Sequence, residues 1–392
     1  MESFQYYSPA NIIFGVGERK NLGKYMSNYK KALLVVAKGP FRDNGVLDEI
    51  KNTLKSSSIE TVEMGDIDSN PRLSSVREGA EVAKKSGADC VVGIGGGSAM
   101  DCAKLIAGAA KSDTDPYDFL WGKRIPIEDA LDIILIPTFA ATGTEVHQYG
   151  VIVNDETKQK WYCGVKFPSI TLMDPELTAT VPIKLTIWGA MDILSHTFEF
   201  YFNNNTSSEF QSRFSEAIIL ATMNAVERLI ADPRDLNARG ELMYNAIMAW
   251  GGLTKIGRGD PDMACHFIEE SFSGYFDTHH GGCLGVLTPR WMGSALEDVP
   301  APFARFGRNV FGLDGNDDVQ VARKAVALYK EWLKKIGAPN TFDDLGDRDF
   351  SDEKLKYVAT TACNIYGGTV GQIKKYDAEG AFELLKLGTI AY

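Results

Sequence analysis

The chain has 392 residues, of which 44% are hydrophobic, so it is long enough to form more than one buried core. Its formal net charge is −11, and this acidity argues against nucleic acid or an anionic membrane surface as a partner. The sequence has neither a stretch of about 18 apolar residues nor a basic segment followed by an apolar one at its start. Its six cysteines form no C-x-x-C pair, which is typical of buried thiols in a reducing compartment. We therefore expect a cytoplasmic protein that neither spans nor binds a membrane.

The first half of the chain alternates short apolar runs with amphipathic segments. The predicted strands are 32–37, 59–64, 90–94 and 133–136, and the predicted helices between them are 46–54, 72–86 and 98–110. Nearly all-apolar strands that alternate with helices predict a parallel sheet covered on both faces. After these elements, 151–153 and 160–163 flank a charged turn and predict an antiparallel hairpin, and 170–173 predicts a last strand.

The segment Gly93–Ser98 contains four glycines between a predicted strand and a predicted helix. Glycines let backbone N–H groups approach an anion, and the helix start at Ser98 adds N–H donors that lack intrahelical partners. The pattern is neither the dinucleotide motif G-x-G-x-x-G nor the P-loop. We expect a pyrophosphate site here; the alternative is a tight turn that only requires positive φ angles. Small and hydroxyl residues at 137–145, after the next strand, favour a second contact with the same nucleotide.

Three of the five histidines fit a metal-ligand pattern with one aspartate. Asp192 and His196 are four residues apart in a predicted helix and project from one face, and His266 and His280 follow later. One carboxylate and three imidazoles suit a divalent ion such as Fe²⁺ or Zn²⁺. The alternative is a set of packed or solvated side chains, with His280 as a helix cap. His147 is expected to be solvated or to face the substrate.

Beyond residue 182 the pattern becomes helical, most clearly at 210–230, 238–255 and 319–335. We therefore predict two domains, an α/β domain at 1–181 and an all-helical domain at 182–392.

These motifs resemble the iron-containing, or group III, alcohol dehydrogenases, and within them the butanol dehydrogenases and lactaldehyde reductases. The segments that carry the resemblance are Gly93–Lys104, 137–145, Asp174-Pro175, Gly189–Glu199 and the pair His266 and His280. The resemblance implies a Rossmann-like, dinucleotide-binding α/β domain followed by an all-α metal-binding domain, the dehydroquinate synthase-like fold. Homodimers are common among such relatives, so a homodimer is expected.

The resemblance also implies the site residues. One divalent metal, Fe²⁺ or else Zn²⁺, would be held by Asp192, His196, His266 and His280. The dinucleotide would be bound by Asn70, Gly96, Gly97, Ser98, Asp101, Thr138, Thr142 and Lys160.

Two departures from the family pattern affect the cofactor and the proton path. After the first predicted strand, where some relatives carry an acidic residue that excludes a 2′-phosphate, this chain has Val36–Pro40 without a carboxylate. Lys38 would attract that phosphate, so we expect NADP(H) to be favoured over NAD(H). Four residues after His266, where relatives often have another histidine, this chain has Glu270, so Glu270 or His279 is expected to carry the proton.

The expected function is hydride transfer between NAD(P)(H) and a small primary alcohol or aldehyde whose oxygen the metal polarises. A glycerol dehydrogenase or a dehydroquinate synthase of the same fold would also fit the motifs. An apolar pocket, rather than one for a phosphorylated substrate, is indicated by four phenylalanines near the ligands in the sequence: Phe198, Phe200, Phe267 and Phe272. A metal-dependent hydrolase would use the same ligands without a nicotinamide, and a nucleotide-binding protein without catalysis would use only the glycine turn.

Overall fold

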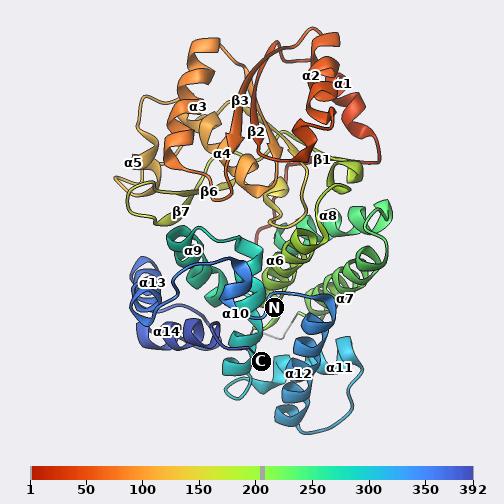
Figure 1. Ribbon diagram of the computed structural model, residues 1–392, viewed down its shortest axis with the longest axis vertical. Helices are drawn as coiled ribbons and strands as arrows, with labels where there is room; N and C mark the ends of the chain where they lie inside the picture. Colours follow the sequence, from red (N-terminus) through yellow and green to blue (C-terminus); the bar gives the residue numbers. More distant parts are fainter. Residues whose placement is uncertain (1, 204–207, 392) are drawn as a thin grey trace. The chain divides into compact units, whose positions relative to one another are not determined.

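The computed structural model describes residues 2–203 and 208–391. The chain forms two compact units (Figure 1). We call Tyr7–Pro182 with Asp232–Ile247 the α/β unit, and Met1–Tyr6, Ile183–Ala231 and Met248–Tyr392 the helical unit. Among the described residues, no helix combines the length and the apolar character needed to cross a membrane.

The α/β unit is built on a six-stranded parallel sheet, as the alternating pattern predicts. In spatial order its strands are β1 (Asn11–Phe14), β8 (Ile170–Met173), β5 (Asp132–Pro137), β4 (Cys90–Gly95), β2 (Lys31–Ala37) and β3 (Glu60–Ile67). The central strand β4 is buried along its whole length, because helices cover both faces of the sheet. A separate antiparallel hairpin joins β6 (Tyr149–Val153) and β7 (Lys160–Gly164).

Alternation along β2 divides the apolar side chains between two cores. Leu33 and Val35 pack with the helices on one face, and Leu34 and Val36 pack with those on the other. The first group comprises α3 (Leu73–Ser86), α4 (Gly97–Ala109) and α5 (Pro116–Leu120). The second comprises α1 (Leu22–Tyr25) and α2 (Val46–Ser56), so the sheet lies between two helical layers (Figure 1).

The helical unit surrounds a helix that is buried on all sides. In α6 (Ile183–Tyr201) every residue from Thr186 to Tyr201 is buried, as expected for a helix that is apolar around most of its circumference. The helices α7 (Glu209–Ala231), α9 (Ala264–Phe276) and α10 (His280–Ala295) pack against it. The unit also contains α11 (Pro300–Phe311), α12 (Asp318–Ile336), α13 (Asp352–Ile365) and α14 (Ala378–Leu387). Short 3₁₀ helices occur at Glu18–Asn21, Pro40–Arg42, Thr144–Val146, Pro175–Thr178 and Phe342–Leu345.

The predicted architecture, an α/β domain followed by a helical domain, is confirmed, and the differences are local. The helix predicted at 238–255 is α8 (Leu236–Trp250), which ends earlier because Gly252 adopts a positive φ of 86°. Most of α8 belongs to the α/β unit, which the sequence did not indicate. The strand β1 was not predicted either. It has only four residues, Asn-Ile-Ile-Phe, at the edge of the sheet, and they show no alternation of apolar and polar side chains.

Candidate metal centre and cofactor site

The glycine turn connects β4 to α4 and leaves the start of that helix open. At Gly95 φ is 151°, and a Cβ there would lie 2.5 Å from the Cβ of Ala37, so only glycine fits. Gly96 is the N-cap of α4, no side chain caps the helix, and its first turn contains no acidic residue. Gly96, Gly97 and Ser98 are partly exposed beside a fully buried strand, which leaves a helix N-terminus that can bind an anion.

The loop after β5 lies beside this turn, as predicted. The N–H of Thr138 donates to the carbonyl oxygen of Gly95 at 2.9 Å. A Cβ on Gly97 would approach the hydroxyl oxygen of Thr142 to 2.9 Å, so Thr142 is in contact with the start of α4. The two segments that the sequence assigned to one nucleotide therefore share one edge of the sheet.

Two further predicted cofactor residues contact each other. The Nζ of Lys160, in the hairpin, donates to Oδ1 of Asn70 at 3.3 Å, and both side chains are buried. Asn70 has a positive φ of 54°, a conformation that asparagine tolerates better than most residues. His147, expected to be solvated or to face the substrate, is half-buried, and its Nδ1 accepts from the N–H of Tyr149 at 3.1 Å.

Asp101, one of the residues expected to bind the dinucleotide, has hydrogen-bond partners within the protein. Its carboxylate accepts from the hydroxyl of Thr144 at 2.5 Å and from the N–H of Val151 at 3.2 Å, and burial raises its pKa. The fully buried Lys104, one helical turn away, donates to the hydroxyl and the carbonyl oxygen of Thr144 at 2.5 and 2.6 Å. It also donates to the carbonyl oxygens of His147 and Tyr149 at 2.8 and 3.0 Å, so this pair fixes the loop after β5.

Lys38, which is expected to attract a 2′-phosphate, has an acidic partner. Its Nζ lies 2.6 Å from Oδ1 of Asp68, and the hydrogen bond to this carboxylate raises the pKa of Lys38. The segment that follows β2 contains no carboxylate, but Asp68 follows the neighbouring strand β3 and so lies beside Lys38. The positive charge expected to attract a 2′-phosphate is therefore already paired.

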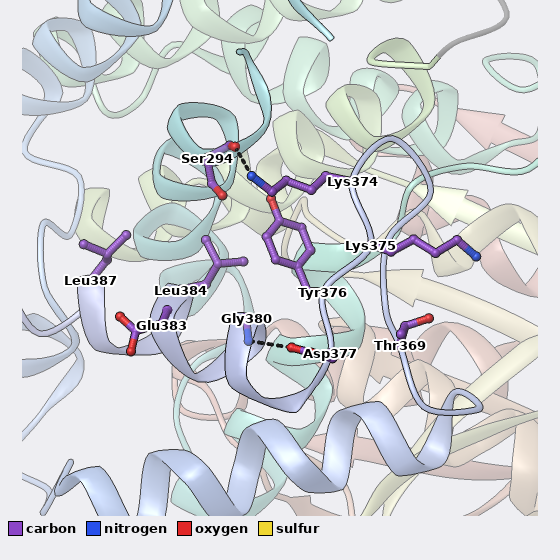
Figure 2. Close-up of a pocket in the computed structure, with 10 residues that line it drawn as sticks. All are labelled: Ser294, Thr369, Lys374, Lys375, Tyr376, Asp377, Gly380, Glu383, Leu384 and Leu387. Carbon is purple, nitrogen blue, oxygen red and sulfur yellow. Dashed lines mark hydrogen bonds between the residues drawn. The ribbon is translucent and has the colours of Figure 1, made fainter. Parts of the chain in front are cut away.

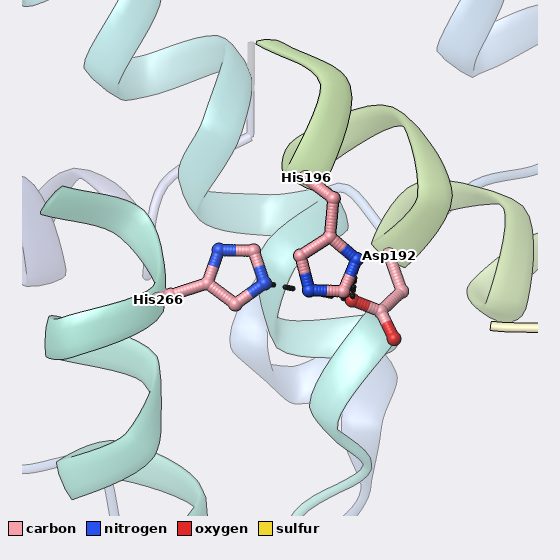
Figure 3. A group of neighbouring side chains, drawn as sticks. All are labelled: Asp192, His196 and His266. Carbon is pink, nitrogen blue, oxygen red and sulfur yellow. Dashed lines mark ion pairs between the residues drawn. The ribbon is translucent and has the colours of Figure 1, made fainter. Parts of the chain in front are cut away.

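The four predicted metal ligands come together within the helical unit. Asp192 and His196 lie on α6, His266 on α9, and His280 is the first residue of α10. From Oδ1 of Asp192, Nδ1 of His196 is 3.5 Å away, Nε2 of His266 is 3.6 Å away and Nε2 of His280 is 3.5 Å away. Figure 3 shows the first three side chains pointing toward one another from two helices.

This donor set fits a divalent ion. In a tetrahedral site with ligands about 2.0–2.1 Å from the ion, the ligand atoms lie about 3.3–3.4 Å apart. Four buried atoms here have no hydrogen-bond partner: both carboxylate oxygens of Asp192, Nδ1 of His196 and Nε2 of His266. Buried polar atoms without partners are costly, and a shared cation would satisfy all four. The side chain of His280 is 22% exposed, so the centre is accessible on that side.

Burial and neighbouring charges shift the pKa values of the cluster in different directions. Burial lowers the pKa of His196 to about 3, which keeps this imidazole neutral and able to bind a cation. Burial also acts to lower the pKa of His266, but the Glu199 and Asp192 carboxylates together outweigh it and raise that pKa to about 10. Although burial alone would raise the pKa of Asp192, the imidazoles of His196 and His280 hold it well below its usual range.

Two buried glutamates that the sequence analysis missed contact the histidines. Oε2 of Glu199 is hydrogen-bonded to Nδ1 of His266, and Oε2 of Glu269 is hydrogen-bonded to Nδ1 of His280. The residue expected on the proton path, Glu270, is next to Glu269 but accepts a hydrogen bond from the hydroxyl of Tyr366.

The second residue expected on the proton path, His279, is the N-cap of α10. Its Nδ1 accepts from the N–H of Gly282 at 3.4 Å, and its ring centroid is 5.0 Å from that of Trp188. This places it next to His280 in the chain and against α6.

Two of the four phenylalanines expected near the ligands, Phe198 and Phe272, lie in the core instead of lining a pocket, which corrects that part of the prediction. Phe198 is two positions from His196 and therefore on another face of α6, where it packs on Phe202 and Tyr329. Phe272 packs on Phe276 and on further rings of the core. Both side chains are fully buried and belong to the core of the helical unit.

A separate surface pocket lies between α10 and α14 (Figure 2). The Nζ of Lys374 donates to the carbonyl oxygen of Ser294 at 2.7 Å and forms an ion pair with Asp298 at 2.8 Å. None of the four predicted metal ligands is among its lining residues.

Comparisons with known proteins agree with this geometry. Residues 9–175 match the family model of iron-containing alcohol dehydrogenases, and 186–387 match the C-terminal model of the Fe-containing alcohol dehydrogenase family. The chain belongs to the iron-containing alcohol dehydrogenase family, as the sequence predicts.

Three relatives illustrate the similarity. A probable NADH-dependent butanol dehydrogenase of Bacillus subtilis (strain 168) is 34% identical over 98% of this chain and 99% of its own length. The crystal structure of an NADH-dependent butanol dehydrogenase A from Thermotoga maritima superposes with a TM-score of 0.94 at 35% identity, covering 100% of this chain and 99% of that one. An NADPH-dependent aldehyde reductase of Escherichia coli (strain K12) is 26% identical over 88% of this chain and 90% of its own length.

Proposed function

We propose that this protein is a metal-dependent alcohol dehydrogenase or aldehyde reductase that transfers a hydride between a nicotinamide dinucleotide and a small primary alcohol or aldehyde. The observation that carries the proposal is the convergence of His196, His266 and His280 within 3.5–3.6 Å of one carboxylate oxygen of Asp192. These four residues would hold one divalent ion, Fe²⁺ or else Zn²⁺, and such an ion supplies a Lewis acid for the alcohol or aldehyde oxygen.

The protein's own residues determine how such a centre works. The near-complete burial of Asp192, His196 and His266 excludes water, which strengthens every electrostatic interaction among them. The more exposed His280 marks the side from which a small substrate would enter. His279 and Glu270 are the candidates for carrying the hydroxyl proton: His279 lies next to His280, and Glu270 is already hydrogen-bonded to a tyrosine hydroxyl.

We propose NADH as the cofactor, which revises the preference drawn from Lys38. The start of α4 offers glycine N–H groups and an uncapped N-terminus for the pyrophosphate. The carboxylate of Asp68 neutralises Lys38 and would repel a 2′-phosphate. The Bacillus and Thermotoga relatives are both named as NADH-dependent, whereas the more distant Escherichia relative is named as NADPH-dependent.

The competing functions have less support. A glycerol dehydrogenase, a dehydroquinate synthase or a metal-dependent hydrolase would not be expected to share most of its length with butanol dehydrogenases at 34% identity. A nucleotide-binding protein without catalysis would not need four converging ligand side chains. The homodimer expected from the resemblance stays a prediction, which the molar mass in solution would test.

The test is metal analysis followed by turnover. Protein purified without oxygen is analysed for iron and zinc, stripped with a chelator and reloaded with Fe²⁺ or Zn²⁺. We expect butanal-dependent oxidation of NADH by the reloaded protein and not by the stripped protein. Turnover that survives in metal-free protein carrying His266→Ala would contradict the proposal, and metal-dependent ester or amide hydrolysis without NADH oxidation would support a hydrolase instead.

A further inference from the structure

The sequence contains a repeated spacing that explains how the two buried glutamates are placed. His196 is followed three residues later by Glu199, and His266 is followed three residues later by Glu269. Residues three apart lie on the same side of a helix, so each pair presents an imidazole and a carboxylate toward the neighbouring helices. His280, the last of the three histidines, is followed at the same spacing by Cys283.

Each glutamate contacts the next histidine along the chain rather than the histidine of its own pair. Glu199 on α6 is hydrogen-bonded to Nδ1 of His266 on α9, and Glu269 on α9 is hydrogen-bonded to Nδ1 of His280 on α10. Both carboxylates are fully buried. The contacts therefore run in one direction through the three helices, and each helix orients the ligand on the next.

We propose that Glu199 and Glu269 are positioning residues that set the tautomer and ring orientation of His266 and His280 for metal binding. This inference rests on the proposed function, because it assigns a role toward the metal that the four ligands would hold. A histidine that donates its Nδ1–H to a carboxylate has its proton fixed there, and its Nε2 then carries the lone pair. Nε2 is the atom that both histidines direct at Asp192, at 3.6 and 3.5 Å.

The contrast with His196 supports this assignment. His196 directs Nδ1, not Nε2, toward Asp192, so it uses the nitrogen that the other two histidines engage with glutamates. The hydrogen bonds of the two glutamates go to His266 and His280. The glutamates therefore act on specific histidines rather than on the cluster as a whole.

The charges of the cluster also support a role of the two glutamates in metal binding. Asp192, Glu199 and Glu269 are carboxylates that are 0–1% exposed, and they surround three imidazoles. Buried carboxylates are costly unless positive charge and hydrogen bonds compensate them. A divalent cation held by Asp192 and the three histidines would supply positive charge that compensates these buried carboxylates.

Glu199 has a second role, in the fold. Its Oε1 accepts from the backbone N–H groups of Cys265 and His266 at 2.8 and 3.3 Å, so it also caps the first turn of α9. Replacing Glu199 should therefore weaken both metal binding and the fold, whereas replacing Glu269 should mainly weaken metal binding. Glu269 is consequently the cleaner test.

The experiment measures Co²⁺ affinity by chelator competition in the full-length protein, with the visible absorption of bound Co²⁺ as a report on its ligand geometry. The variant Glu269→Gln keeps the size of the side chain, but its amide can also donate to Nδ1 and so favour the wrong tautomer of His280. We expect Co²⁺ to bind about 10–100-fold more weakly, with an altered spectrum and an unchanged melting temperature of the metal-free protein. Glu199→Gln should weaken Co²⁺ binding similarly and also lower that melting temperature.

The control is Glu216→Gln. Glu216 is another buried glutamate of the helical unit, and it accepts hydrogen bonds from Tyr201 and Arg305 instead of a histidine. Its replacement should leave Co²⁺ affinity unchanged even where it lowers stability. Should Glu269→Gln fail to fold, Glu269→Asp shortens the side chain and should also bind Co²⁺ more weakly.

The outcomes separate this inference from the function on which it rests. Wild-type affinity and an unchanged spectrum in Glu269→Gln, or equal losses in Glu269→Gln and Glu216→Gln, would overturn the positioning role while leaving the metal centre intact. A wild-type protein that binds no Co²⁺, Zn²⁺ or Fe²⁺ would instead overturn the proposed function.

Discussion

Gly281 lies where α10 passes closest to α6, one residue after His280, and replacing it with alanine tests whether this close approach holds the metal centre together. A Cβ at this position would lie 2.1 Å from the carbonyl oxygen of Trp188 and 3.3 Å from the Cβ of Asp192. Ordinary contact begins at 3.4 Å, so the helices would have to separate locally by about 1 Å, because the atom in the way belongs to the backbone.

The expected loss of stability can be compared with the effect of replacing Gly293, a glycine of the same helix that has space for a side chain. Overpacking of this kind destabilises proteins by about 1–3 kcal/mol. Gly293, also in α10, is exposed, and a Cβ there would meet nothing within 4 Å, so Gly293→Ala should stabilise by about 0.5–1 kcal/mol. Moving His280 by about 1 Å relative to Asp192 should also lower butanal turnover about 100-fold.

The assay compares Gly281→Ala with Gly293→Ala in urea unfolding of the metal-free protein and in turnover after reloading with metal. Gly281→Ala should lose stability and turnover, and Gly293→Ala should lose neither. Stability and turnover at the wild-type level in Gly281→Ala would refute the argument that this glycine sets the spacing between the ligand helices.

Three further predictions concern the loop after β5, cofactor binding and proton transfer. Lys104→Met removes the donor from three carbonyl oxygens, one buried and two partly buried, and should lower the free energy of unfolding by about 3 kcal/mol in urea titrations; a loss below about 1 kcal/mol would contradict its role in fixing the loop. Asp68→Asn frees the ammonium of Lys38 and should improve NADPH binding about fivefold relative to NADH, an effect that should vanish when Lys38→Ala is added. Of His279→Ala and Glu270→Gln, the variant that removes the proton-path residue should lose about 100-fold in kcat for alcohol oxidation while retaining its metal; unchanged kcat in both would exclude both residues.

Sequence patterns were sufficient where spacing alone determines geometry. The pair Asp192 and His196 must share a helix face, and the glycine turn between a buried strand and a helix must place N–H groups at the carboxyl edge of the sheet. Both expectations agree with the structure, as does the antiparallel hairpin. Helix α10 is harder to predict from the sequence, because two glycines follow its first residue and Pro289 lies inside it, and these residues have low helix propensity. Gly281 is nevertheless needed for the close contact with α6.

The contacts that the sequence did not reveal join residues from different elements. Asp68 was overlooked as the partner of Lys38 because the two residues are 30 positions apart in the chain and meet only because they follow neighbouring strands. Glu269, one position before the Glu270 that is expected on the proton path, was also overlooked as the carboxylate that contacts His280. The spacing His-x-x-Glu, present twice, was the available signal, but only the three-dimensional arrangement shows that each glutamate serves the next histidine.

The assignment of residues 232–247 to the α/β unit has a practical consequence for dissecting the protein. A truncation at residue 182 would look natural from the sequence, yet it would remove from the N-terminal fragment a helix that closes part of its surface. Arg239 donates to the carbonyl oxygen of Val181, and Phe14 packs against Gly240, so both groups would be left without these contacts. The C-terminal fragment would in turn carry that helix with its apolar face uncovered, and we expect each piece expressed alone to aggregate, while co-expression would allow them to reassemble.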